Sequence, residues 1–301
     1  MIEYSCAIPP DLGDRIEEVL SEIDSLYWSV HSDHAEGTIL LKGYFRKQSE
    51  GAAAWTELRA SCPELPETPD IHTVDERDWR EAYKEFFEPW SLPGLHWVPE
   101  WMRATHPVPH GEAVLYLDPG MAFGTGNHET TRLCARRLLK ARAHWGDAIR
   151  EKTVIDAGCG SGILALSAAA LGFGTVQAFD NDPEAVRIAQ DNTAANRLDS
   201  IHVSCTDLTG GLSPGSADLL LANILANVLE DHAETLLRAL RPGGVLVLSG
   251  ILREEAAATS AAFAETAARL GIPWQPDSRS EGEWADLCHG GPFHPQETPT
   301  P

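Results

Sequence analysis

The sequence is poor in basic residues and lacks long apolar runs. Of its 301 residues, 23 are Lys or Arg and 45 are Asp or Glu, which gives a formal net charge of −22. An acidic surface repels RNA and anionic membranes and attracts basic partners, although the same charge also serves solubility alone. No apolar run approaches the length of a membrane-spanning helix. We therefore expect no direct nucleic-acid binding, no membrane association and, as possible partners, basic proteins.

Cysteines are few and scattered, at positions 6, 62, 134, 159, 205 and 288. No two form a Cys-x-x-Cys pair and none stands near a His at ligand spacing, so we expect no metal site. Cys159 is expected to be a small buried residue rather than a nucleophile. The first residues, Met1 to Tyr4, lack a basic region and an apolar stretch, so we expect no secretory signal. These features favour the reducing cytoplasm. We also expect a monomer, although nothing in the sequence fixes the oligomeric state.

The most informative segment, residues 154–162, reads Val-Ile-Asp-Ala-Gly-Cys-Gly-Ser-Gly between an apolar strand and an apolar helix. Glycines such as Gly158 and Gly160 let the backbone approach a ligand closely, because no Cβ intervenes. Asp180 ends the next strand, where its carboxylate can accept from both ribose hydroxyls of a nucleoside. The nicotinamide fingerprint would need Gly or Ala at position 163, where Ile163 stands. The predicted cofactor is therefore S-adenosylmethionine, with its methionine carboxylate at the N-terminus of the following helix.

Two patterns divide the chain. Residues 1–74 show the order strand, helix, strand, strand, helix, strand, which predicts a small ferredoxin-like α+β domain. Its expected strands are 2–8, 27–30, 38–45 and 71–74, and its expected helices are 11–23 and 49–59. A helix with an aromatic stripe, 75–87, begins a linker that continues to residue 109.

Residues 110–290 alternate strand and helix, which predicts an α/β domain with a mostly parallel sheet covered on both faces. The expected strands are 114–117, 153–155, 175–179, 201–204, 217–221 and 245–248. The expected helices are 129–142, 162–171, 183–196, 228–240 and 253–270. Segments 274–276 and 284–288 would close the sheet as a hairpin with an antiparallel edge. The Pro/Thr-rich tail, 291–301, is expected to be disordered.

Ligands of such sheets bind at the carboxyl ends of the strands. A glycine-rich loop precedes Thr130 and Thr131, whose hydroxyls could bind a ligand or cap the helix that follows. His128 could be a base or a hydrogen-bonding scaffold. Asp182, followed by Pro183, is expected to cap a helix. Asn223 follows a strand, so its amide could accept from an attacking amine where the methyl group leaves, or it could be a simple turn residue.

Five motifs, in order, resemble the ribosomal protein L11 methyltransferase (PrmA) family. They are residues 117–126, 154–166, 222–226, 242–252 and 281–284. The resemblance spans residues 75–290, and it implies a class I methyltransferase Rossmann-like fold and a substrate-recognition role for residues 1–74. It also implies contacts to S-adenosylmethionine from Thr131, Gly158, Asp180 and Asn223. Its implied reaction is methylation of lysine ε-amines and the N-terminal α-amine of a basic ribosomal protein, up to trimethylation.

One departure from the family pattern falls at the cofactor loop. The family usually has Thr and Pro where this chain has Asn127 and Glu129, so the edge that faces the acceptor could differ. Three other functions are compatible with parts of the sequence. They are lysine methylation of a different protein, a non-catalytic assembly factor that binds the cofactor, and an NAD-dependent oxidoreductase, which Ile163 disfavours.

Overall fold

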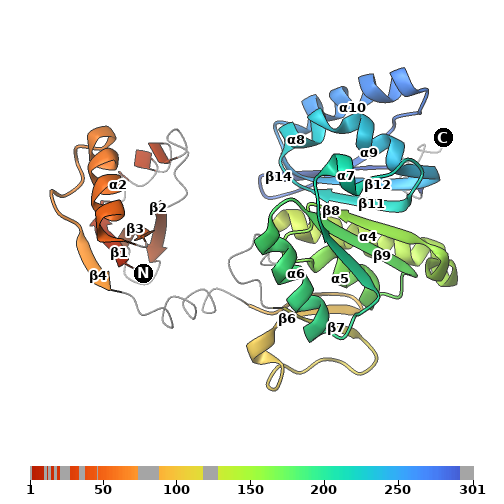
Figure 1. The fold of residues 1–301 in the computed structure, drawn as a ribbon, viewed down its shortest axis with the longest axis horizontal. Coiled ribbons are helices and arrows are strands. Elements are labelled where there is room, and N and C mark those ends of the chain that lie inside the picture. Colours follow the sequence, from red (N-terminus) through yellow and green to blue (C-terminus); the bar gives the residue numbers. More distant parts are fainter. Residues whose placement is uncertain are drawn as a thin grey trace, which may run out of the picture. The chain divides into compact units, whose positions relative to one another are not determined.

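The chain divides into two compact units, Met1–Phe86 and Phe87–Pro301 (Figure 1). The computed structural model describes residues 2–9, 12, 15–16, 19–20, 28–33, 38–45, 47–73, 88–117 and 128–291. The predicted linker helix at 75–87, the loop at 118–127 with Asn127, and the tail at 292–301 lie outside the described residues.

The first unit is a four-stranded antiparallel sheet in the order β2-β3-β1-β4. Its elements are β1 (Ile2–Ile8), β2 (Trp28–Asp33), β3 (Thr38–Phe45), α2 (Gln48–Ser61) and β4 (Asp70–Thr73). Alternate residues of β1, such as Tyr4 and Cys6, share a buried core with Trp55 and Leu58 of α2, as expected for a strand with one covered face. Strand order and pairing are those of the predicted ferredoxin-like domain. Its first helix, predicted at 11–23, is described at only five positions.

The second unit is built on a seven-stranded sheet in the order β10-β9-β8-β11-β12-β14-β13. Its strands are β8 (Thr153–Ala157), β9 (Thr175–Asp180), β10 (Ile201–Cys205), β11 (Ala217–Asn223), β12 (Leu240–Leu252), β13 (Asp277–Glu281) and β14 (Trp284–His289). The five strands β8 to β12 pair in parallel, and β14 joins β12 in the antiparallel sense. The predicted mostly parallel sheet with an antiparallel edge is thereby confirmed.

Helices cover both faces of this sheet (Figure 1). The helices are α4 (Glu129–Trp145), α5 (Ile163–Ala170), α6 (Pro183–Ala195), α7 (Leu208–Gly211), α8 (Ala226–Asp231), α9 (Ala233–Ala239) and α10 (Ala256–Leu270), with short 3-10 turns at Glu100–Met102 and Gly146–Glu151. The central residues of β8, β11 and β12 are mostly apolar because both faces of the sheet are buried there. Val154 packs toward α4 and α5, and Ile155 packs toward α8 and α10. Among the helices of the described part of the chain, none is long and apolar enough to cross a membrane.

Three local predictions were wrong. The strand predicted at 114–117 is β7 (Ala113–Leu117), but it lies in a separate three-stranded sheet with β5 (Trp90–Leu92) and β6 (Leu95–Pro99). The alternation of apolar and polar residues in β7 is compatible with a place in either the seven-stranded or the three-stranded sheet. Its place in the three-stranded sheet is decided by its neighbour β6, whose Trp97 packs beside α5 and donates a hydrogen bond to Ser167 (3.0 Å).

The helix predicted at 228–240 is divided into α8 and α9 at His232, whose backbone leaves the helical region (φ −106°, ψ 15°). The first strand of the closing hairpin lies at 277–281 instead of 274–276. The aromatic Trp274 stacks between Phe263 and His289, so its apolar character reflects packing in a loop rather than strand pairing.

Candidate functional site

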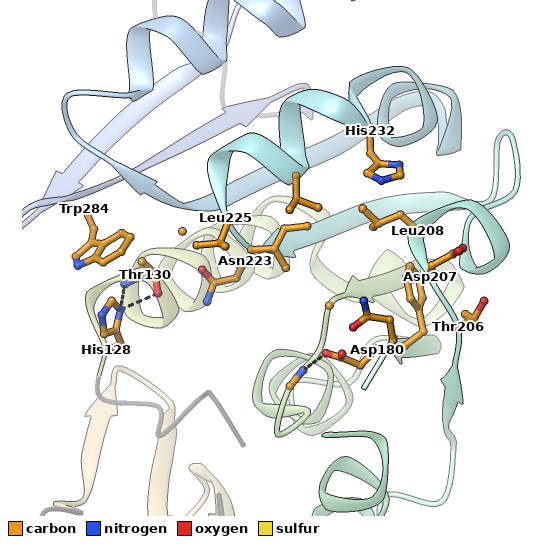
Figure 2. Close-up of a pocket in the computed structure, with 17 residues that line it drawn as sticks. His128, Thr130, Asp180, Thr206, Asp207, Leu208, Asn223, Leu225, His232 and Trp284 are labelled. Atoms are coloured by element: carbon orange, nitrogen blue, oxygen red, sulfur yellow. Dashed lines mark hydrogen bonds between the residues drawn. The ribbon is translucent and has the colours of Figure 1, made fainter. Parts of the chain in front are cut away.

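A cavity of about 480 Å³ opens at the carboxyl ends of the parallel strands. It lies where β8 and β11 separate the two halves of the sheet, the position at which open α/β sheets bind ligands. Residues at or just after the carboxyl ends of β8, β9, β10 and β11 contribute, together with Gly250 within β12, the first residues of α4 and Trp284 of the β13–β14 hairpin. Figure 2 shows His128 and Trp284 at one side, Asp180, Thr206 and Asp207 at the other, and Asn223 between them.

The glycine loop forms one wall of the cavity through Gly158 and Gly160, as predicted from its sequence. Gly158 has a φ of +71°, and a Cβ at this position would lie 2.4 Å from Cγ2 of Ile224. A side chain there would therefore push the loop away from the segment that follows β11. The N–H groups of Gly158 and Cys159 donate to the Phe179 carbonyl (2.9 and 3.0 Å). The loop thus brings its backbone close to the cavity while these two donors stay engaged within the protein.

Asp180 is the carboxylate that the sequence predicted for the ribose, and it lines the cavity at the end of β9. One of its oxygens accepts from Gly160 N–H (2.9 Å) and the other accepts from Asp182 N–H (3.0 Å). Each carboxylate oxygen has two lone pairs, so both keep acceptor capacity while the group is held in one orientation. Asp182 itself caps α6 by accepting from Glu184 N–H (2.9 Å), which confirms its predicted structural role.

Two polar atoms near the start of α4 and the end of β11 lack hydrogen-bond partners among the described residues. They are Oδ1 of Asn223 and Oγ1 of Thr131, both buried. Asn223 and Thr130 line the cavity. Thr131 is as buried as Thr130, at 1% exposed, but it is not one of the lining residues. A buried polar atom without a partner in the protein is costly unless a ligand or a water supplies the hydrogen bond. The predicted cofactor contact through Thr131 stays a prediction.

His128 and Trp284 form the aromatic side of the cavity, which we call the aromatic wall. Their rings meet edge to face with centroids 5.0 Å apart. His128 is the N-cap of α4: its Nδ1 lies 2.9 Å from Thr130 Oγ1 and accepts from Thr130 N–H (Figure 2). Because Nδ1 is engaged in capping, the geometry favours the scaffold interpretation of His128 over the general-base interpretation.

A second carboxyl group, Asp156, lies under the glycine loop and is 1% exposed. It accepts from Ala165 N–H (2.9 Å) in the first turn of α5. Burial raises the pKa of Asp156 to about 7, with the Asp180 charge adding to the shift. Burial likewise raises the pKa of the Cys159 thiol, which is 6% exposed, so the sequence interpretation of Cys159 as a small buried residue holds. Within the described ranges, no group of three His, Cys, Asp or Glu side chains is arranged to hold a metal ion.

Sequence reasoning missed several residues of the wall. Asp207 follows β10 and its Oδ1 accepts from Gly210 N–H (2.7 Å); the rule that ligands bind at strand ends could have found it. His232 and Leu225 flank α8. Leu225 is 65% exposed and is one of two exposed large apolar side chains among the described residues. Trp284 lies on the antiparallel β13–β14 hairpin. The rule that ligands bind at the carboxyl ends of parallel strands therefore does not predict it.

Comparison with known proteins shows which family this chain resembles in sequence. The family model for ribosomal protein L11 methyltransferase (PrmA) matches residues 15–287. A protein of Pelobacter propionicus named ribosomal protein L11 methyltransferase is 37% identical over 309 aligned residues, covering 96% of each chain. One of the same name from Thiobacillus denitrificans is 45% identical over 188 residues, covering 62% of this chain and 59% of its own.

A solved structure shows the same fold. The ribosomal protein L11 methylase of Lactobacillus delbrueckii subsp. bulgaricus superposes with a TM-score of 0.56 at 34% identity, covering 65% of this chain and 93% of that one. These matches confirm the predicted family, the methyltransferase class and S-adenosylmethionine as the cofactor. The chain therefore belongs to the ribosomal protein L11 methyltransferase (PrmA) family.

Proposed function

We propose that this protein transfers methyl groups from S-adenosylmethionine to amines of ribosomal protein L11, at lysine ε-amines and the N-terminal α-amine. The observation that carries the proposal is the unpartnered Oδ1 of Asn223 in the cavity at the carboxyl ends of the strands. The Asn223 Oδ1 atom can accept a hydrogen bond, and an amine substrate carries N–H groups that can donate one.

The residues of the cavity fit the cofactor. Asp180 would accept from the ribose hydroxyls, since its carboxylate is already oriented by two backbone N–H groups. Gly158 and Gly160 would lie along the methionine portion. Thr131 follows the lining residue Thr130, and its buried hydroxyl has unused hydrogen-bonding capacity through which it would contact the cofactor. Asp207 would lie at the nucleobase end, because it follows the strand next to that of Asp180. When bound, S-adenosylmethionine supplies an electrophilic methyl group on a sulfonium.

The chemistry that remains for the protein is to hold a neutral amine. A lysine of ordinary pKa is protonated at pH 7, and deprotonation costs about 4.6 kcal/mol. An apolar, partly dehydrated site lowers that cost, and Ile224, Leu225 and Val228 provide such a surface beside Asn223. The Asn223 oxygen would accept one amine N–H and so direct the nitrogen lone pair, leaving most of the acceleration to proximity and orientation.

The first unit is proposed to recognise the ribosomal protein. It has its own buried core, and all residues that line the cavity belong to the second unit. The net charge of −22 supports a basic partner through long-range attraction. We also propose that the protein acts as a monomer in the cytoplasm and does not bind nucleic acid directly.

The test is transfer of labelled methyl groups from S-adenosylmethionine to purified ribosomal protein L11, with mass spectrometry to locate the modified amines. We expect label on lysines and on the N-terminus, and loss of the latter when the N-terminus is acetylated. Binding of S-adenosylhomocysteine without any transfer would favour a non-catalytic assembly factor instead. Label on another protein in an extract, with none on L11, would favour a different lysine substrate.

A further inference from the structure

The β13–β14 hairpin carries Trp284, one of the two residues of the aromatic wall, at its tip. Its closing pair is Glu281 opposite Trp284, joined by a turn in which Gly282 has a φ of +59°. Trp284 is also paired with Leu252 of β12, and its ring meets His128. The orientation of the Trp284 ring is therefore tied to how the hairpin tip is held, and Glu281 is the residue directly across from it.

Two arginines of α4 hold Glu281. Arg132 Nε lies 2.9 Å from Glu281 Oε1, and Arg136 Nη1 donates to Glu281 Oε2. Arg132 and Arg136 stand four and eight residues after His128, so all three project from one side of the helix. Near its tip, the hairpin is thus contacted by α4 in two places: His128 lies against Trp284, and this arginine pair lies against Glu281.

A buried ion pair fastens the base of the same hairpin. Arg137 donates to both oxygens of Asp286 (2.8 and 2.6 Å), and both side chains are fully buried. Removing one partner of such a pair leaves a charge buried without compensation and endangers the fold. Glu281 is different: its side chain is 23% exposed and lies at the tip. Because Glu281 is partly exposed, we expect its replacement to endanger folding less than replacement of Arg137 or Asp286 would.

We propose that Glu281 is a positioning residue that sets the orientation of Trp284 in the part of the cavity where the acceptor amine binds. This inference rests on the proposed function for its kinetic consequence. The cofactor residues Asp180 and Asp207 lie on the opposite side of Asn223 from Trp284 (Figure 2). Loss of the Glu281 ion pairs therefore weakens acceptor binding and leaves cofactor binding unchanged.

The experiment compares Glu281→Gln with a matched control, Glu234→Gln. Glu234 also accepts from an arginine (Arg238, 2.8 Å) and lies near a second (Arg269, 3.9 Å), but it stands on α9 outside the cavity wall. We expect Glu281→Gln to raise KM for the acceptor protein roughly three- to tenfold. Its kcat and its Kd for S-adenosylhomocysteine should stay within about twofold, and the control should match the parent protein in all three.

Two further measurements separate positioning from general destabilisation. In a Trp284→Phe background, Glu281→Gln should add almost nothing to the acceptor KM, because its effect passes through Trp284. Glu281→Asp, which retains the charge, should recover part of the loss. An equal rise in KM in both backgrounds, or a parallel loss of cofactor affinity, would overturn the proposal.

A spectroscopic readout keeps the test independent of methyl transfer. In protein labelled with 5-fluorotryptophan, the ¹⁹F resonance of Trp284 is assigned by its absence in Trp284→Phe. Glu281→Gln should shift or broaden that resonance and leave Trp145 unaffected, while Glu234→Gln should change neither. If no protein substrate is methylated but the Trp284 resonance moves, the proposed function fails and the positioning role stands. An unmoved Trp284 resonance refutes the positioning role.

Discussion

Replacing Asp180 by Ala is the sharpest test of how the cofactor is held. In the structure its two oxygens accept from Gly160 N–H and Asp182 N–H at 2.9 and 3.0 Å, which fixes the carboxylate against the cavity. A hydrogen bond to an ionised group contributes about 1.5–3 kcal/mol. Since about 1.4 kcal/mol corresponds to a tenfold change in Kd, we expect Asp180→Ala to weaken binding by roughly 10- to 150-fold.

Calorimetric titration with S-adenosylhomocysteine measures this loss. The control is Asp182→Ala, which removes a helix cap in the same turn and should lower stability by about 1 kcal/mol without changing Kd. A 2′-deoxy analogue of the ligand sharpens the test: the parent protein should bind it more weakly, and Asp180→Ala should bind both ligands alike. Unchanged affinity in Asp180→Ala, or an equal loss in Asp182→Ala, would refute the assignment of Asp180 to the ribose.

Three other changes have defined outcomes. Asn223→Ala should lower kcat for methyl transfer by more than it lowers affinity for S-adenosylhomocysteine, and equal losses in kinetics and calorimetry would contradict its role toward the amine. Gly250→Ala should destabilise the protein, seen as a lower Tm, by more than the ~1–2 kcal/mol expected from left-handed backbone alone, because its Cβ would lie 2.4 Å from the Ile224 carbonyl oxygen. Gly243 has a similar φ, but a Cβ there would meet no atom within 4 Å, so Gly243→Ala should lose only the stability that left-handed backbone costs. An equal loss of stability in the two variants would contradict the close contact at Gly250. For Asp156, the pKa is raised by burial to about 7, above the ~4 of an unfolded chain. The folded state therefore binds more protons between these values, and stability falls as pH rises from about 4 to 7. Asp156→Asn should flatten this slope in urea denaturation at pH 5 and pH 7.5, and an unchanged slope would show that other groups cause it.

Local signals along the chain predicted much of the second unit. The apolar runs of β8, β9 and β11, the glycine turn after β8 and the cap at Asp182 depend on neighbours in sequence, so periodicity and turn chemistry reveal them. The same signals placed Gly158, Gly160, Asp180 and Asn223 at one edge of a sheet, because parallel strands bring their carboxyl ends together. In the structure, all four residues line the same cavity.

Other features were not visible in the sequence because they depend on contacts between distant segments. Both possible sheets satisfy the alternation of β7, and only the packing of Trp97 beside α5 decides between them. Trp284 reaches the cavity from an antiparallel hairpin, about 120 residues along the chain from the glycine loop, so strand-end reasoning gave it no role.

The sequence by itself thus determined the family, the cofactor class and the residues at the strand ends, since each rests on short-range pattern. Tertiary structure alone decided that Thr130 rather than Thr131 lines the cavity, and that α4 holds the hairpin tip through Glu281. The physical reason is that the direction of a side chain and the partner of a charge are set by packing between elements, which no local spacing specifies.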